Sequence, residues 1–181
     1  MGMFAITKSA NPTPAEERAR RIADPGFGKT FTDHMVMIRY NETLGWHDAK
    51  VMPRGPLSID PATAVLHYAQ EIFEGLKAYR LADGSMALFR PEANAKRFRD
   101  SAQRLAMAEL PEDLFIESLR QIVSIDRDWF PDIEGGSLYL RPFMFASEVF
   151  LGVKPSSEYI YLVLASSVGG YFKSGAPAIS L

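Results

Sequence analysis

Residues 76–90 read LKAYRLADGSMALFR, and this stretch gives the strongest local indication of how the chain folds. Two strand-like runs flank Asp83-Gly84, a pair suited to the positive φ angles of a tight hairpin turn. The stretch therefore predicts a β-hairpin.

Strand-like patterns also lie on both sides of this hairpin. Before it, Met35 and Met37 alternate with Val36 and Ile38, and the polar residues NETLG separate them from a second run, WHDAKVMP. After it, SLYLRPFMFASE and EYIYLVLASSV are rich in β-branched and aromatic residues, which is typical of buried strands. We expect one pair of strands before the hairpin and another after it.

Three helices are expected between these strands. The first would have Ser58 or Asp60 as its cap and Pro61 at its first position, with an apolar stripe running to Ile72. Helices starting at Pro91 and Pro111 would follow, each with apolar residues at spacings of three and four. The apolar residues of these two helices are Phe98, Ala102 and Leu105, and then Phe115, Leu119, Ile122 and Ile125.

These elements predict an α+β domain, with an antiparallel or mixed sheet and about three helices on it. We expect this small domain to span residues 31–168, after an irregular N-terminal arm at 1–30. Residues 169–181 have the small, flexible composition of a linker that leads to another domain. Because the chain ends on an apolar Ile-Ser-Leu, we expect that large domain to be missing from it.

The composition, 47% apolar and 23% charged in 181 residues, is that of an ordinary globular protein. The net charge of −2 gives no electrostatic case for binding nucleic acid or an anionic membrane. No apolar run approaches the roughly 20 residues that span a bilayer. The lack of cysteine suits the cytoplasm. These facts exclude classes of partner but indicate no function.

Common catalytic motifs are absent. The sequence has no glycine-rich phosphate loop and no nucleophile motif, and its histidines, His34, His47 and His67, are not at metal-ligand spacings. We therefore interpret the histidines as structural and expect no metal.

Arg141 is the clearest candidate for a functional residue. It lies within the apolar run LYLRPFMFA, two residues after Tyr139 and so on the same face of a strand. A buried guanidinium needs an anion, which would be either a structural carboxylate or an anionic ligand. Arg97 and Arg104 share a helix face, for which exposure to solvent is the simpler interpretation. Gly75 would be needed for backbone reasons where a helix ends and a strand begins.

Five segments strongly resemble the branched-chain amino acid aminotransferases, which are fold-type IV pyridoxal phosphate enzymes. They are PGFGKTFTDHMV, LHYAQEIFEGLKAYR, LFRPEANAKRFRDSAQRL, SLYLRPF and LGV, in the family's order and spacing. The resemblance implies transfer of the amino group of leucine, isoleucine or valine to 2-oxoglutarate, with pyridoxal 5'-phosphate as cofactor. It also implies a homodimer whose small-molecule partners are amino acids and 2-oxo acids.

The resemblance also assigns roles to residues. Arg97 would bind the phosphate of the cofactor, and Tyr68 would place its hydroxyl near the substrate carboxylate. The other substrate-binding residues would be Phe27, Phe73, Tyr139, Arg141, Leu151, Val153 and Tyr171. Four of these, Tyr139, Arg141, Leu151 and Val153, would act in the partner subunit's site, and Tyr171 would lie on the interdomain loop. Arg141 could then meet the distal carboxylate of glutamate, while its apolar neighbours contact a branched side chain.

The family's catalytic lysine lies in a segment ending Lys-x-Gly-Gly-Asn-Tyr, which has no counterpart here. We therefore assign no catalytic residue to this chain and expect it to be inactive alone. Two other interpretations stay open. One is a D-amino acid aminotransferase or aminodeoxychorismate lyase relative, and the other is a non-catalytic interaction domain.

Overall fold

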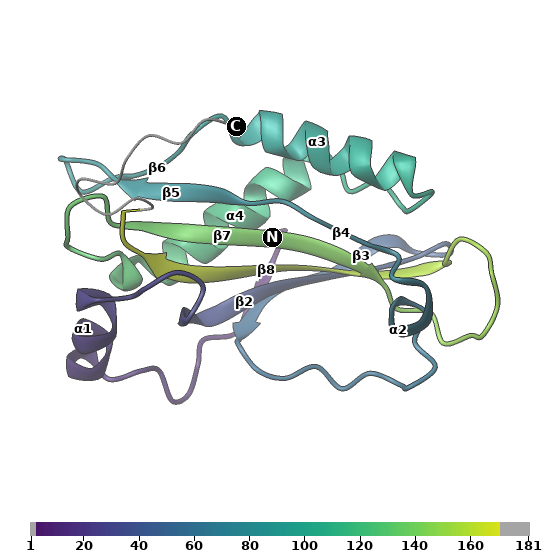
Figure 1. The fold of residues 1–181 in the computed structure, drawn as a ribbon, viewed down its shortest axis with the longest axis horizontal. Coiled ribbons are helices and arrows are strands. Elements are labelled where there is room, and N and C mark those ends of the chain that lie inside the picture. Colours follow the sequence, from purple (N-terminus) through teal and green to yellow (C-terminus); the bar gives the residue numbers. More distant parts are fainter. Residues whose placement is uncertain (1–2, 171–181) are drawn as a thin grey trace, which may run out of the picture.

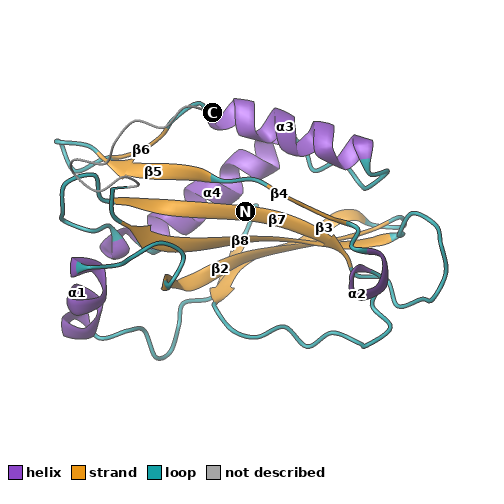
Figure 2. Cartoon of the chain, in the orientation of Figure 1, coloured by secondary structure: helices purple, strands orange, loops and turns teal. Residues whose placement is uncertain are grey.

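The computed structural model describes residues 3–170, which form one sheet with helices packed on it (Figure 1; Figure 2). The strands are β1 (Ala5–Ile6), β2 (Thr30–Asn41), β3 (Gly45–Pro53), β4 (Glu71–Phe73), β5 (Leu76–Arg80), β6 (Met86–Leu88), β7 (Ser137–Ala146) and β8 (Glu158–Val168). The helices are α1 (Ala15–Ala23), α2 (Val65–Tyr68), α3 (Pro91–Arg104) and α4 (Glu112–Ile125), and one 3₁₀ turn spans Arg127–Trp129. Tyr171 and nearly all of the expected linker lie outside the described residues.

The sheet has the order β1-β3-β2-β8-β7-β5-β6, and β4 also pairs with β7. The β1–β3 pair is parallel, whereas the other pairs are antiparallel. The predicted α+β class, with a mixed sheet and about three main helices, is thereby confirmed. Within residues 3–170, none of the helices combines the length and the apolar character that crossing a bilayer requires.

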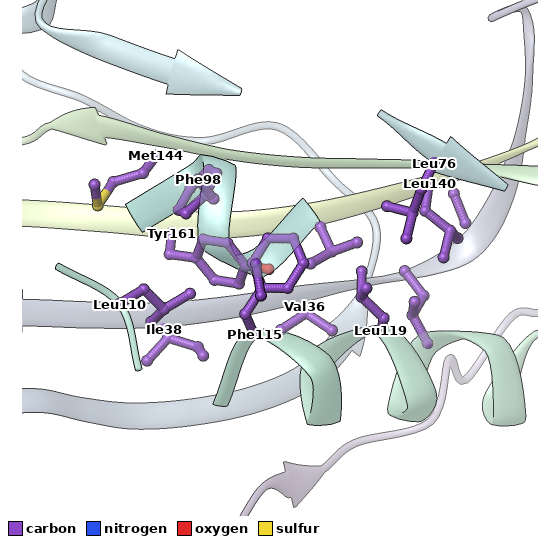
Figure 3. Packing of buried hydrophobic residues seen from close by; sticks show 14 of the residues in the cluster. Val36, Ile38, Leu76, Phe98, Leu110, Phe115, Leu119, Leu140, Met144 and Tyr161 are labelled. Carbon is purple, nitrogen blue, oxygen red and sulfur yellow. The ribbon is translucent and has the colours of Figure 1, made fainter. Parts of the chain in front are cut away.

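The central strands β2, β7 and β8 bury residues on both faces. Val36 and Ile38 belong to the large core beneath α3 and α4, whereas Met35 and Met37 belong to a smaller cluster on the opposite face. This is the alternation that the sequence predicted for β2. Figure 3 shows Phe115 and Leu119 of α4 pointing toward the core residues of the sheet.

Three aromatic rings join α3, α4 and β8 at the centre of the large core. The ring of Phe98 lies 5.3 Å from that of Phe115 and 5.5 Å from that of Tyr161 (Figure 3). Burial raises the pKa of Tyr161, whose hydroxyl lies 2.9 Å from Oγ of Ser118. The predicted apolar faces of both helices are thus largely confirmed, except that Leu105 caps α3 and is exposed.

The predicted hairpin is formed by β5 and β6, but its turn is longer than expected. The strands end at Arg80 and Met86, and Gly84, at φ 80°, is the residue of the Asp83-Gly84 pair with a positive φ. Hydrogen bonds from the hydroxyl and the backbone N–H of Ser85 hold the pKa of Asp83 below its ordinary value.

The helix predicted from Pro61 to Ile72 is wrong over most of its length. Only Val65–Tyr68 is helical, because Ala69 takes a left-handed conformation (φ 50°) and ends the helix. The next residues form β4, which pairs with Phe143–Phe145 of β7. Hydrogen bonds to the free edge of β7 thus stabilise a strand here more than the weak helical pattern favours a helix.

Strands β4 and β5 pair with successive parts of β7 and are separated by Glu74 and Gly75. This break lies opposite Pro142, whose carbonyl accepts a 2.9 Å hydrogen bond from the N–H of Glu74. Because proline has no N–H to give in return, the ladder is interrupted here. Phe73 is thus the last residue of β4, and Glu74 and Gly75 connect two strands, and not a helix and a strand as predicted.

The N-terminal arm is also more ordered than predicted, because it contains β1 and α1. Asp33 accepts hydrogen bonds from the N–H (3.1 Å) and the hydroxyl (2.7 Å) of Thr13. His34 accepts the N–H of Ser9 at Nε2, and its Nδ1 lies 2.7 Å from the buried carboxylate of Asp126. The bonds of Thr13 and Ser9 attach the arm to β2, and the contact with Asp126 joins β2 to the end of α4. Both contacts of His34 agree with a structural role for it.

Burial alone would raise the pKa of Asp33, but the hydrogen bonds from Thr13 and Trp129 and the charge of His34 outweigh it and lower the pKa. An aspartate with a lowered folded pKa stabilises the fold above its unfolded pKa of about 3.9, and this stabilisation is lost as the pH falls. We expect Thr13→Val to reduce the free energy of unfolding by about 0.5–1.5 kcal/mol near neutral pH.

Urea unfolding at about pH 7 and about pH 3 measures this difference, which should shrink at the lower pH, where Asp33 is protonated in the unfolded chain. Thr43→Val, at an exposed threonine, is the control and should change the stability little at either pH. An equal loss at both pH values would show that the Asp33 carboxylate is not the partner that matters.

Candidate functional site

The face of the sheet away from α3 and α4 carries one group of the predicted substrate residues. Leu138 and Leu140 of β7 point into the large core under these helices. Tyr139 and Arg141 alternate with them and so point to the opposite, more open face. The prediction that these two side chains share a face is confirmed by a direct contact between them.

A pocket of about 240 Å³ lies on this open face. Its walls are Phe27, Gly28, Phe31, Tyr139, Arg141, Leu164, Ala165 and Ser166. Arg141 is the one charged residue among these eight, so an anion entering the pocket would meet a cation in aromatic and apolar surroundings.

The guanidinium of Arg141 is held by aromatic side chains. Its Nε and Nη2 donate hydrogen bonds of 3.0 and 2.6 Å to the hydroxyl of Tyr139, and its carbon Cζ lies 4.3 Å from the ring centre of Phe73. The ring of Tyr139 in turn lies 5.2 Å from that of Phe27. Arg141 is half-buried, less than the sequence suggested. Within residues 3–170 no carboxylate forms an ion pair with it.

Gly75 leaves room for the hydroxyl of Tyr139. A Cβ atom at Gly75 would lie 2.6 Å from that oxygen and 3.2 Å from two carbons of the ring. Gly75 does not have a positive φ, so the prediction that it is needed for backbone reasons alone is wrong. A glycine is required because Tyr139 packs against the chain at the break between β4 and β5.

Arg97 lies on α3, where its side chain is 61% exposed and paired with the buried carboxylate of Glu74. Its Nε and Nη2 donate to the two oxygens of Glu74 at 2.9 and 2.8 Å, and Asn94 donates to the same carboxylate at 2.8 Å. The hydrogen bonds from Arg97 to Glu74 and the charge of that carboxylate raise the pKa of Arg97. Nη1 takes no part in this pair.

Tyr68, Leu151 and Val153 form a second group at the end of the sheet that carries α2 (Figure 1). Tyr68 stacks on Phe150, with ring centres 6.0 Å apart. Phe150 belongs to the β7–β8 loop, which also carries Leu151 and Val153. These two residues are 71% and 95% exposed.

Glu148 anchors this loop. Its carboxylate accepts hydrogen bonds from Lys154 and from the N–H of Ser157, both at 2.7 Å, and these lower its pKa although burial acts in the opposite direction.

The structure therefore brings together Phe27, Phe73, Tyr139 and Arg141, and connects Arg97 to them through residues 73–75. Glu74 is a site residue that the sequence pattern did not predict. An acidic residue within the apolar stretch IFEGL was the available signal, because a buried carboxylate needs partners. A larger hollow of about 600 Å³ between β6 and α4 contains none of the predicted site residues, so we place the candidate site on the open face.

Known proteins resemble this chain in sequence, although no protein-family model matches it. The branched-chain-amino-acid aminotransferase of Mycolicibacterium smegmatis is 57% identical over 183 residues, which cover 99% of this chain and 50% of the relative. A probable branched-chain-amino-acid aminotransferase of Streptomyces coelicolor is 57% identical over 178 residues, 97% of this chain and 49% of the relative. The chain thus spans about half the length of the curated relatives it matches.

Solved structures resemble the fold. The T.th. branched-chain amino acid aminotransferase with pyridoxamine 5'-phosphate has a TM-score of 0.58 at 24% identity, over 78% of this chain and 42% of that one. The same protein complexed with 4-methylvaleric acid has a TM-score of 0.54 at 25% identity, over 72% of this chain and 40% of that one.

We expect Gly75→Ala to destabilise the fold by about 1–3 kcal/mol, because the added methyl group collides with the hydroxyl of Tyr139. In a Tyr139→Phe background the hydroxyl is gone, and the same substitution should cost much less. Thermal or urea unfolding of the four proteins measures this coupling. Gly55→Ala is the matched control, because a Cβ there meets no atom within 4 Å. If Gly75→Ala lowered the free energy of unfolding equally in both backgrounds, the proposed packing of Tyr139 against Gly75 would be contradicted.

Proposed function

Because the chain is homologous to branched-chain amino acid aminotransferases over about half of their length, we propose that it is the small domain of such an enzyme. The enzyme would move the amino group of leucine, isoleucine or valine to 2-oxoglutarate. The observation that carries this proposal is Arg141, a cation without a carboxylate partner among the described residues, in an otherwise apolar and aromatic pocket.

We place Tyr139 and Arg141 with Phe27 in one pocket of this chain, and not in the partner subunit's site as the resemblance implied. Such a pocket suits two dissimilar substrates. A branched aliphatic side chain gains from contact with apolar and aromatic walls, of the kind that Phe27 and Leu164 provide. The distal carboxylate of glutamate needs a charged donor, and Arg141 can offer one next to the hydroxyl of Tyr139. Each substrate would thus use a different part of the same surface. The complex of the T.th. enzyme with 4-methylvaleric acid, a branched acid, supports this proposal.

Pyridoxal phosphate would supply the reactive carbonyl group and the electron-withdrawing ring. The residues of this chain fit its phosphate, because Arg97 is exposed, held in one orientation and free to donate from Nη1. A planar guanidinium matches the oxygen cluster of a phosphate. The pyridoxamine 5'-phosphate in the T.th. structure is the reason to propose this cofactor class.

The second group of residues fits a role outside its own domain. Leu151 and Val153 are presented to the surface on a loop that Glu148 holds in place. Large exposed apolar side chains on an ordered loop are typical of a contact with another chain or domain. In a homodimer they would form apolar walls of the partner subunit's pocket, and Tyr68, next to Phe150, would place its hydroxyl near the substrate.

We expect Arg141→Gln, in the full-length enzyme, to lower kcat/KM for glutamate and 2-oxoglutarate by about one to two orders of magnitude, the effect of losing a charged hydrogen bond of about 1.5–3 kcal/mol. The half-reaction with leucine should change much less, because its side chain has no charge to pair. Single-turnover kinetics of each half-reaction, beside a thermal melt, measure this difference. Equal losses for leucine and glutamate would contradict the dual-substrate role, and activity restricted to D-amino acids would contradict the proposed function.

Arg97→Ala should weaken retention of pyridoxal phosphate far more than it changes the preference among leucine, isoleucine and valine. One charge-assisted bond of about 1.5–3 kcal/mol corresponds to a loss of about tenfold or more in affinity. Dialysis followed by absorbance measures the bound cofactor, and Arg104→Ala on the same helix is the control. If the variant retains pyridoxal phosphate as well as the parent enzyme does, Arg97 does not bind the phosphate and is only an exposed residue of the helix surface.

A further inference from the structure

We propose that Glu74 is a positioning residue that orients Arg97 toward the phosphate of pyridoxal phosphate. This inference rests on the proposed function and extends it to a residue that binds neither cofactor nor substrate. It starts from the pair between a buried carboxylate and an exposed guanidinium at the break between β4 and β5.

The geometry of the pair fixes the plane of the guanidinium. Two parallel hydrogen bonds, from Nε and from Nη2, reach the two oxygens of one carboxylate. Such a bidentate contact sets both the position and the rotation of the group, which a single bond would not. The edge that carries Nη1 is then directed away from Glu74 and is available to an anion.

The carboxylate itself is fixed by a second residue of α3. Asn94, three residues before Arg97 and so about one helical turn away, donates a 2.8 Å hydrogen bond to it. Glu74 therefore links α3 to the β4–β5 break at two points. An arginine side chain held in this way has already lost its rotamer freedom, so a ligand does not have to restrict it on binding.

Orientation and charge make opposite contributions to phosphate binding. The negative charge of Glu74 repels a phosphate, so charge alone predicts tighter binding when it is removed. Loss of the fixed orientation of Arg97 predicts weaker phosphate binding when Glu74 is replaced. Because the guanidinium is 61% exposed, solvent screens the repulsion, and we expect orientation to have the larger effect.

The neighbours of Glu74 extend this role to the substrate pocket. Phe73 lies against the guanidinium of Arg141, and Gly75 leaves room for the hydroxyl of Tyr139. Three consecutive residues thus set the positions of both arginines that the proposed function assigns to anions.

The test uses Glu74→Gln and Glu74→Asp in the full-length protein, with Glu71→Gln, at an exposed glutamate of β4, as the matched control. Equilibrium dialysis measures the Kd for pyridoxal phosphate, and a thermal melt verifies the fold. We expect both variants at position 74 to weaken binding at least about tenfold, and the control to change it less than about twofold. Glu74→Asp keeps the charge but shortens the side chain. If only the charge of Glu74 affected the affinity for pyridoxal phosphate, this variant would bind it like the parent.

A second readout needs no cofactor. In ¹⁵N spectra the Nε–H signal of Arg97 should be shifted and protected from exchange in the parent, and should move to the position of free arginine in Glu74→Gln. If Glu74→Gln does not fold, Glu74→Asp provides both measurements, the affinity for the cofactor and the Nε–H signal of Arg97.

Tighter or unchanged binding by Glu74→Gln, parent-like binding by Glu74→Asp, or a free-arginine signal in the parent would each overturn the role of Glu74. Failure of the parent protein to bind pyridoxal phosphate would instead overturn the proposed function, and with it the ligand assigned here.

Discussion

The placement of the Glu74 carboxylate constrains much of the rest of the structure. A buried carboxylate is costly unless hydrogen-bond donors surround it, and its donors come from Asn94 and Arg97 of α3. The helix is therefore fixed against the break between β4 and β5. That break exists where Pro142 of β7 has no N–H to offer, and Glu74 lies directly opposite it.

The two faces of the sheet differ in what covers them and in the residues they carry. One face is closed by α3 and α4 over an aromatic core that includes Phe98 and Tyr161, and it stabilises the domain. The other is partly open and carries Tyr139 and Arg141, which are held by contacts between side chains of the same face. Because neighbouring residues of β7 serve opposite faces, the packing of the core fixes the positions of the candidate binding residues.

Local pattern was enough to predict the long strands and the two long helices, and the shared face of Tyr139 and Arg141. Local pattern failed where contacts between residues distant in the sequence determine the local structure. The segment after Tyr68 became a strand because β7 had an unpaired edge, and the arm became ordered because Thr13 binds Asp33. The reason for Gly75 could not be read from its neighbours in the sequence, since Tyr139, the residue it must accommodate, lies 64 positions further along the chain. Chain order carries little information about such contacts.

The order of strands in the sheet also has a consequence for association between copies of the chain. The long, apolar strands β7 and β8 are interior, while the sheet ends with β1 and β6, of two and three residues. Part of β3 extends beyond β1, and Asp48 in this part has a positive φ. The carboxylate of Asp48 accepts a hydrogen bond from Lys50, the residue of β3 opposite Ala5. Short outer strands, an irregular backbone and charges all disfavour the addition of a foreign strand. The fold thus keeps its most aggregation-prone segments away from its edges, where they could template the growth of fibrils.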